Sequence, residues 1–286
     1  MLESKNVFIN EESKLNSENI IDLRETTNHP LSLLYSEIYT QAILNGTVNH
    51  GRLQPGFNLA GNAPFVIAAK KAIEVGKDNN QKYVIENVLN QYYNTVQPKN
   101  AAEWLGVDFN YGHKLLSLPP WAGVLPWRAR TVESYQSAFE TAAIKEAQSF
   151  GYHADIKDGW LYCGPVSARK VNVEAQRIVT VLNSMIQNGY QRSNRKDGDV
   201  RATALVNEDR NWRWLITYGN HRASVASSLG YENIPIRVNL VICREHVDFW
   251  PHVVNGLYTK SQALEVFDRL FDGVTPSKTE KWEKLV

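Results

Sequence analysis

The spacing of apolar residues along the chain changes near residue 150. Before that point, apolar residues recur at helical spacing over 31–46, 65–73, 83–93 and 131–149, which predicts four helices. The run 46–64 is rich in Gly, Asn and Pro and is predicted to be a loop. The Pro- and Trp-rich run 116–130 cannot be a regular helix, because proline lacks the backbone donor that a helix interior needs.

After residue 150 the pattern predicts short strands around two helices. The strands are expected at 160–163, 201–206, 212–218 and 234–243, and the helices at 172–188 and 220–229. The polar run 207–211 predicts a hairpin turn. A last helix over 260–272 begins with a capping box, Thr259 with Gln262 three residues later, and ends at Gly273.

The two patterns together predict an α+β fold. We expect a small mixed β-sheet with packed helices over 151–286 and a mainly helical region over 1–150, with a soft boundary near residue 150. Helix 172–188, with Asn172 as its N-cap, is expected to pack on that sheet. Its buried positions are predicted to be Ile178, Val181, Leu182 and Met185, and its outward positions Arg177 and Gln187.

Composition narrows the class of protein. The 286 residues are 43% hydrophobic and 21% charged, with a net charge of +1 and a pI near 7.8. A dedicated DNA-binding protein usually has a strong basic excess, so no nucleic-acid partner is expected. Cys163 and Cys243 lie in apolar runs and are predicted to be buried free thiols. The start of the chain lacks a signal-peptide pattern, and no apolar run approaches the ~20 residues that span a bilayer, so a cytoplasmic location is expected.

The most informative segment is the junction between strand 212–218 and helix 220–229. An alternating strand ends at Gly219, Asn220 is the expected N-cap, and His221 and Arg222 open a short helix that stops at Gly230. Such a junction directs free backbone N–H groups and the positive end of a helix dipole toward one point, where anions bind. The alternative is purely structural: the arginine and the histidine cap the start of an ordinary helix and bind no ligand.

These residues also carry a family resemblance. Gly-x-x-Arg at 219–222, followed by Leu-Gly at 229–230 and Ile-Pro at 234–235, resembles the nucleotide-binding signature of the ParB/sulfiredoxin superfamily. The segments 160–167 and 184–190 fit the same family, so the resemblance covers about residues 155–245. It implies a ParB/sulfiredoxin-like fold that holds nucleotide phosphates at this motif.

Two departures indicate which branch of the superfamily is closest. Asn220 stands where sulfiredoxin has its reactive cysteine, so that thiol chemistry is not expected here. Only about fifty residues follow Ile236, with one strand and one helix, which does not provide the helix-turn-helix of chromosome-partition ParB. The most similar branch is then that of the free-serine kinases, which use such a nucleotide-binding core to transfer phosphate to a small hydroxyl compound.

Ser167, Lys170 and Glu174 form a second group of candidates, near the start of helix 172–188. Ser167 and Lys170 are predicted phosphate contacts. The resemblance implies that a carboxylate from this neighbourhood acts as base for the acceptor hydroxyl, and Glu174 is its nearest equivalent. An acidic residue in a first helical turn also has a purely structural explanation, because it complements the helix dipole.

Two further groups are candidates for the metal and the substrate. Asp197 and Asp199 flank a glycine and are the candidate ligands for Mg²⁺, although a solvated turn, the favoured interpretation, explains the same residues with no ion. In loop 119–130, tryptophan faces could stack on a sugar or base, and arginines could bind carboxylate or phosphate. The expected substrate contacts are Trp121, Trp127, Arg128 and Arg130, unless the tryptophans are simply buried.

The function predicted from these groups is an ATP- or ADP-dependent phosphotransferase that uses Mg²⁺ and acts on a small hydroxyl-bearing metabolite or sugar. His221 and Glu174 are the expected catalytic residues, and Gly219, Asn220, His221, Arg222, Ser167 and Lys170 the expected cofactor contacts. The first alternative is a non-catalytic nucleotide-binding regulator, and the second is a ParB-like DNA-associated protein. The chain has no P-loop motif and no dinucleotide fingerprint, which removes those standard nucleotide-binding classes.

Overall fold

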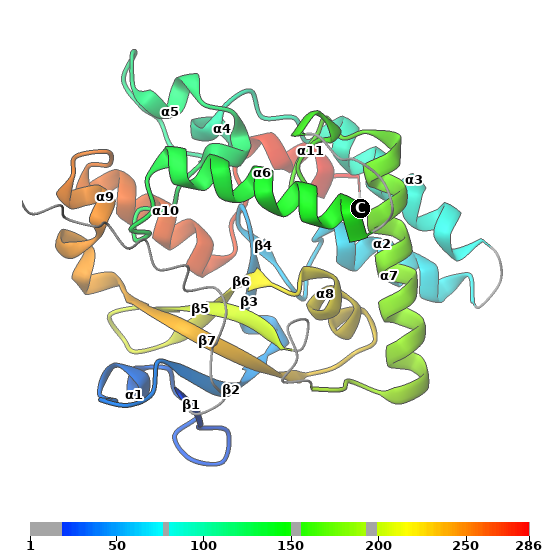
Figure 1. Cartoon of the computed structure of the whole chain (residues 1–286), viewed down its shortest axis with the longest axis horizontal. Coiled ribbons are helices and arrows are strands. Elements are labelled where there is room, and N and C mark those ends of the chain that lie inside the picture. The colour runs from blue at the N-terminus through cyan, green and yellow to red at the C-terminus, as the bar shows by residue number, and fades with distance from the viewer. Residues whose placement is uncertain (1–18, 77–79, 150–155, 193–198, 286) are drawn as a thin grey trace, which may run out of the picture.

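The computed structural model describes residues 19–76, 80–149, 156–192 and 199–285. These residues form a mixed α/β structure with a seven-stranded mixed sheet in the order β1-β2-β7-β5-β6-β3-β4 (Figure 1). The strands are β1 (Ile20–Asp22), β2 (Gln41–Thr47), β3 (Gly51–Leu53), β4 (Phe57–Asn58), β5 (Val200–Val206), β6 (Trp212–Tyr218) and β7 (Asn233–Cys243).

Parallel and antiparallel pairs alternate across this sheet. The pairs β1–β2, β7–β5 and β6–β3 are parallel, and β2–β7, β5–β6 and β3–β4 are antiparallel. The predicted hairpin over 207–211 is confirmed, because it joins the antiparallel pair β5–β6. Strand β7 pairs with β2 on one side and β5 on the other, so strands from both sides of residue 150 form one sheet. A division of the chain at that residue stays a prediction.

The described residues contain eleven α-helices. They are α1 (Leu31–Leu34), α2 (Pro64–Glu74), α3 (Gln81–Thr95), α4 (Ala101–Leu105), α5 (Lys114–Ser117), α6 (Val132–Ser149), α7 (Ala168–Asn188), α8 (Asn220–Ser228), α9 (Pro251–Val254), α10 (Lys260–Asp272) and α11 (Glu280–Glu283). The expected helices at 65–73, 83–93, 131–149 and 260–272 are confirmed as α2, α3, α6 and α10. Both halves of the Thr259–Gln262 capping box form at α10.

The N-terminal region is less helical than expected, since it supplies strands β1–β4. The predicted helix over 31–46 is wrong: only the short α1 is helical, and Gln41–Thr47 is strand β2. The apolar spacing was misleading because β2 lies inside the sheet, where both of its faces are covered and consecutive residues are buried. Ala42, Ile43 and Leu44 are all buried. The predicted loop 46–64 likewise contains β3 and β4.

Helices α2, α3, α7 and α8 pack together beside one end of the sheet (Figure 1). On α7, Ile178, Leu182 and Met185 are buried as predicted, whereas Val181 is half-buried. The main contacts of this helix are with α3 and α8, and its buried residues share one core with residues of the sheet, so its direct packing on the sheet stays a prediction. Helix α7 therefore faces α8 directly, and this contact forms the candidate site.

The starts of α7 and α8 also differ from the prediction. Helix α7 begins at Ala168 because the Oγ of Ser167 accepts the backbone N–H of Lys170 at 3.1 Å, which leaves Asn172 inside the helix. Gly219, not Asn220, is the N-cap of α8, with φ +88°. A Cβ at Gly219 would lie 3.2 Å from the Cα of Val200, so both conformation and space favour glycine there.

Three smaller predictions have different outcomes. The predicted strand 160–163 is wrong, because only an isolated bridge joins Trp160 to Cys163. Cys163 and Cys243 are buried free thiols, as expected. Within the part of the chain that the structure describes, none of the helices is both long enough and apolar enough to cross a membrane.

Candidate anion site at the junction of α7 and α8

The N-terminus of α8 presents unpartnered backbone donors. Its first helical hydrogen bond runs from the N–H of Ala223 to the carbonyl of Gly219, at 3.0 Å. The N–H groups of Asn220, His221 and Arg222 have no hydrogen-bond partner among the described residues. Free donors in a first helical turn carry the positive end of the helix dipole, so this turn suits an anion.

Arg222 adds an unpaired positive charge to the same turn. Its Nη1 is buried and has no hydrogen-bond partner among the described residues, and none of their carboxylates pairs with it. Burial raises the pKa of Tyr190 to about 12, and the charge of Arg222 acts against this rise, which places the guanidinium near the Tyr190 hydroxyl. Arg222 as a whole is half-buried, but a buried nitrogen of a charged group without a partner is costly, and a bound anion would remove that cost.

A buried ionic cluster fastens α7 to α8. Glu174 of α7 is fully buried, and its Oε2 lies 2.6 Å from the Nε2 of His221 on α8. Its Oε1 lies 2.8 Å from the Nζ of Lys170, one helical turn earlier, and the Nη1 of Arg177 lies 3.7 Å from Oε2. The sequence predicted Glu174, Lys170 and His221 as site residues, and the structure brings all three together.

The charge state of Glu174 decides what it can do. Burial alone would raise the pKa of this carboxyl, but the charge of His221, present whenever its imidazole is protonated, and its hydrogen bond, together with Lys170 and Arg177, hold the pKa well below its usual value. A carboxylate with so low a pKa is a weak base. It can only accept hydrogen bonds, so the Nε2–H of His221 donates to it and the imidazole is oriented.

His221 is also held by stacking, and one of its two ring nitrogens has no hydrogen-bond partner among the described residues. Its ring lies on Phe65 of α2 with centroids 4.8 Å apart and planes 22° from parallel. Its Nδ1 has no partner among the described residues, so this nitrogen can accept a proton while Nε2 remains bonded to Glu174. Phe65 was missed from the sequence, because nothing in helix 65–73 indicates that it meets residue 221.

Asn220 and Ser167 hold neighbouring segments in place. The Nδ2 of Asn220 donates to the hydroxyl of Tyr162 at 2.9 Å, while its buried Oδ1 has no hydrogen-bond partner among the described residues. Ser167 caps α7, and its hydroxyl donates to Asp158 at 2.7 Å. Ser167 therefore shapes the start of α7, and Asn220 offers an acceptor beside the first turn of α8.

A small pocket opens beside Asn220. Its free volume is about 20 Å³, which is enough for one water-sized group. Its walls are mainly apolar and come from α2, α3, the β3–β4 connection and the 160–163 turn, and they include Phe57, Phe65, Tyr92, Leu161 and Tyr162. The bulk of any ligand must therefore lie outside this pocket, over the start of α8.

Loop 119–130 is arranged differently from the substrate site that was predicted there. Trp127 is buried edge-on against Trp250 and Phe267, with ring centroids 5.2 and 5.9 Å away. The Nη2 of Arg128 donates to the hydroxyl of Thr203 at 3.3 Å. Both side chains therefore contact the protein's own residues.

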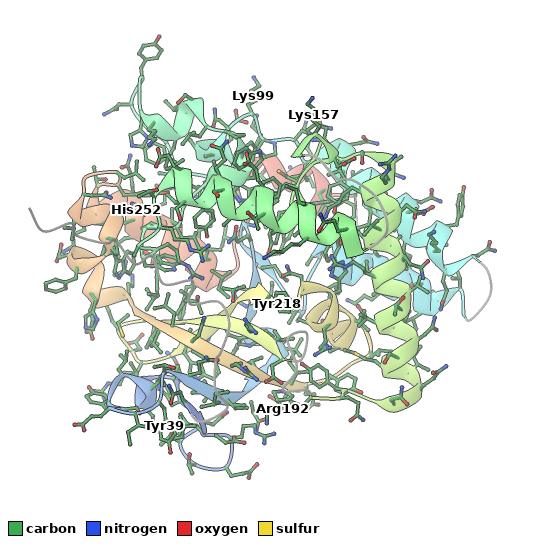
Figure 2. All side chains as sticks on the ribbon, viewed as in Figure 1. Tyr39, Lys99, Lys157, Arg192, Tyr218 and His252 are labelled. Atoms are coloured by element: carbon green, nitrogen blue, oxygen red, sulfur yellow. The ribbon has the colours of Figure 1, made fainter. Side chains whose placement is uncertain are left out.

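The other two residues of that loop lie nearer its surface. Trp121 is half-buried and stacks on Phe139 of α6 at 5.2 Å. Arg130 is exposed, and its carbonyl pairs with His252. Figure 2 shows His252 beside α9, across the molecule from α7, so Arg130 is far from the junction.

The predicted magnesium ligands do not form a carboxylate site among the described residues. Asp197 lies outside the described residues. Asp199 is buried, and its carboxylate accepts hydrogen bonds from Arg237 at 2.6 Å and from Arg192 at 3.2 Å. No group of three or more His, Cys, Asp or Glu side chains suited to a metal is found in the described part of the chain.

Comparison with family models, curated proteins and solved structures finds no match to this chain. The resemblance of residues 155–245 to the ParB/sulfiredoxin superfamily therefore stays a prediction. The case for a function depends on the geometry of the α7–α8 junction.

Proposed function

We propose that the protein is a nucleotide-dependent phosphotransferase that binds the phosphates of ATP or ADP at the N-terminus of α8. The phosphoryl group goes to a hydroxyl of a small metabolite or sugar. One observation carries the proposal: three backbone N–H groups and the Arg222 guanidinium, all in the first turn of α8, have no anionic partner among the described residues. The expected ParB/sulfiredoxin-like character of residues 155–245 belongs to the same proposal.

Phosphoryl transfer depends mainly on positioning and on neutralising the charge of the phosphates. The α8 turn supplies fixed backbone donors, and Arg222 supplies a planar fork that matches phosphate oxygens. Lys170 adds a buried positive charge nearby, shared with Glu174. When bound, the nucleotide contributes the phosphoryl group, and the chain contributes donors and charge.

His221 is the residue best placed to take the proton of the acceptor hydroxyl. Its Nδ1 is the nitrogen left over, and Glu174 fixes its orientation and stabilises the imidazolium that forms. The role predicted for Glu174 thus becomes that of a positioning residue. Its low pKa supports this assignment, since so weak a base does not take the proton of a hydroxyl.

Magnesium belongs to the proposal only as a companion of the nucleotide. Because Asp199 is paired with two arginines, it does not suit a metal, and no step is assigned to the ion. Mg²⁺ commonly keeps substrate phosphates and water among its ligands, so few protein carboxylates are needed.

Binding is tested by titrating ATP and ADP, with and without Mg²⁺, into the wild-type chain and Arg222→Ala in a calorimeter. We expect the variant to lose nucleotide binding, because the charge that faces the phosphates is removed. Arg244→Ala is the matched control, since that guanidinium already pairs with Asp268 and Glu208. Equal nucleotide affinity in the wild type and Arg222→Ala would reject the site.

Turnover is tested by incubating the protein with ATP and a metabolite pool and following ADP by chromatography. His221→Asn should lower the rate by about 10²- to 10⁴-fold, the usual contribution of a general base, while leaving nucleotide affinity within a few-fold. A rate that does not change in His221→Asn would remove this residue from the chemistry.

The regulatory alternative is favoured by the burial of Glu174, whose ion pairs would also fasten α7 to α8 in a protein with no chemistry. Tight nucleotide binding without ADP formation would support it. A DNA-associated role would require retarded bands in a gel-shift series at low salt.

A further inference from the structure

The turn at 160–164 is clamped against α3 by hydrogen bonds to its backbone. The hydroxyl of Tyr92 donates to the carbonyl of Tyr162 at 2.5 Å, and that of Tyr93 donates to the carbonyl of Leu161 at 2.9 Å. The N–H of Gly164 donates to the carbonyl of Val96 at 2.9 Å. Two bonds from α3 and one to Val96, the residue that follows the helix, fix this turn, so the side chains on it are held in place before any ligand arrives.

This turn presents half-buried aromatic rings that lead toward the α7–α8 junction. Trp160 lies 4.8 Å from Tyr162 and 6.4 Å from Phe139 of α6, between ring centroids. Behind them, the fully buried Trp104 lies 5.1 Å from Trp160. Trp160, Tyr162 and Phe139 are only half-buried, and we call these three rings the aromatic wall.

At the end of the wall, Tyr162 and Asn220 leave one donor and one acceptor unused. The Tyr162 oxygen accepts from the Nδ2 of Asn220, and its own O–H has no acceptor among the described residues. The Oδ1 of Asn220, a residue more than nine-tenths buried, has no donor there. Burial raises the pKa of Tyr162 to about 12, although its bond from Asn220 opposes the rise, so the phenol keeps its proton at neutral pH.

A group that both donates and accepts complements such a pair: a hydroxyl does so by donating to Asn220 and accepting from Tyr162, and a water molecule can hold its place before a ligand binds. A carboxylate cannot donate, and the charge of Glu174 is close enough to act on Tyr162. An ammonium cannot accept. The pocket lined by Tyr162 and Asn220 has about 20 Å³ of free space, enough for one hydroxyl but not for a ring.

We propose that the aromatic wall and the Asn220–Tyr162 pair form the acceptor subsite, and that the acceptor is a neutral cyclic polyol of the sugar type. Its ring lies against the wall, and one hydroxyl enters the pocket beside His221. This inference rests on the proposed function, because it identifies the substrate class of the same site. It moves the acceptor away from Trp127, Arg128 and Arg130 of loop 119–130, whereas Trp121 of that loop stacks on Phe139 and so adjoins the wall.

The test is saturation-transfer NMR on the full chain, with saturation of the aromatic protons and three probes. The probes are methyl β-D-glucopyranoside, glucuronate and L-serine. We expect transfer to the ring protons of the glucoside. Binding of glucuronate and serine should be at least about tenfold weaker, because glucuronate must bring a charged carboxylate out of water and serine has no ring to lie against the wall. Equal or tighter binding of serine or glucuronate would overturn the assignment.

Tyr162→Phe tests the hydrogen-bonding part of the subsite. The clamp from Tyr92 reaches the backbone of residue 162, so the ring stays in place when the hydroxyl is removed. We expect glucoside binding to weaken about 2- to 10-fold, the value of one hydrogen bond. Tyr83→Phe, an exposed tyrosine on α3, should leave it unchanged. An unchanged affinity in Tyr162→Phe, or an equal loss in Tyr83→Phe, would overturn the subsite.

The two proposals can fail separately. If ATP and ADP do not bind the wild-type chain but the glucoside does with the expected Tyr162 dependence, the phosphotransferase is wrong and the ring subsite stands. If the nucleotide binds with the expected Arg222 dependence and the glucoside does not bind, with or without nucleotide, the ring subsite is wrong and the proposed function stands.

Discussion

The α7–α8 junction and loop 119–130 were both predicted to bind ligands, and they differ in what surrounds their polar groups. At the junction, Arg222 and the first N–H groups of α8 have no partner among the described residues. In the loop, Trp127 packs on Trp250 and Phe267, and the Nη2 of Arg128 bonds to Thr203, although the Nε1 of Trp127 and the Nε of Arg128 are also buried without a partner among the described residues. The backbone of a helix start makes its own donors available locally, whereas the role of a tryptophan depends on which distant residues pack on it.

The largest effect is expected at the junction. Glu174→Ala leaves Lys170, His221 and Arg177 without their shared carboxylate, and removing one partner from a buried ion pair costs about 3–5 kcal/mol. We therefore expect the free energy of unfolding, measured in urea, to fall by that amount.

Glu265→Ala is the matched control for this change. Glu265 pairs with Arg269 on the half-exposed surface of α10, where such a pair contributes about 0–1 kcal/mol. If the two variants lose the same free energy of unfolding, the ionic cluster between α7 and α8 does not stabilise the fold as a buried ion pair does.

A comparable loss of stability, but no loss of nucleotide binding, is expected in the loop. Trp127→Ala removes a buried ring from the Trp250–Phe267 cluster, at a cost of about 3–5 kcal/mol. Calorimetric affinity for ATP should stay within twofold of the wild type under conditions where the variant is folded. A loss of nucleotide or sugar binding in the folded variant would show that Trp127 belongs to the ligand site after all.

The comparison also indicates how far sequence alone could lead. The capped start of α10, the hairpin at 207–211 and the helix start after Gly219 depend on neighbouring residues, and all three were predictable. Strand β2 was mistaken for helix because its burial on both faces depends on β7, which lies far along the chain. Phe65 and the Tyr92 clamp were missed for the same reason, since each meets the site through tertiary packing.

The pH dependence of stability offers a milder test of the junction. Because the pKa of Glu174 is lower in the folded chain than its usual value of 4.5, its contribution is complete above that pH and is lost as the pH falls below it. The advantage of the wild type over Glu174→Gln should therefore shrink by about 1 kcal/mol in the first pH unit below that value. A constant difference across that range, in parallel urea titrations, would show that the carboxylate is not stabilised by its neighbours.

The smallest effect on stability is expected at Arg128, and it tests whether loop 119–130 is separate from the anion site. Its hydrogen bond to Thr203 is long, at 3.3 Å, and removing one such bond costs about 0.5–1.5 kcal/mol. Arg128→Ala should therefore lower the unfolding free energy by about 1 kcal/mol or less and leave ATP affinity unchanged. Arg222→Ala should show the reverse, because its guanidinium has no hydrogen bond or ion pair to lose among the described residues and its loss removes a buried nitrogen that has no partner there. If Arg128→Ala instead weakened ATP binding as strongly as Arg222→Ala, the two regions would belong to one site, and the separation between them would be wrong.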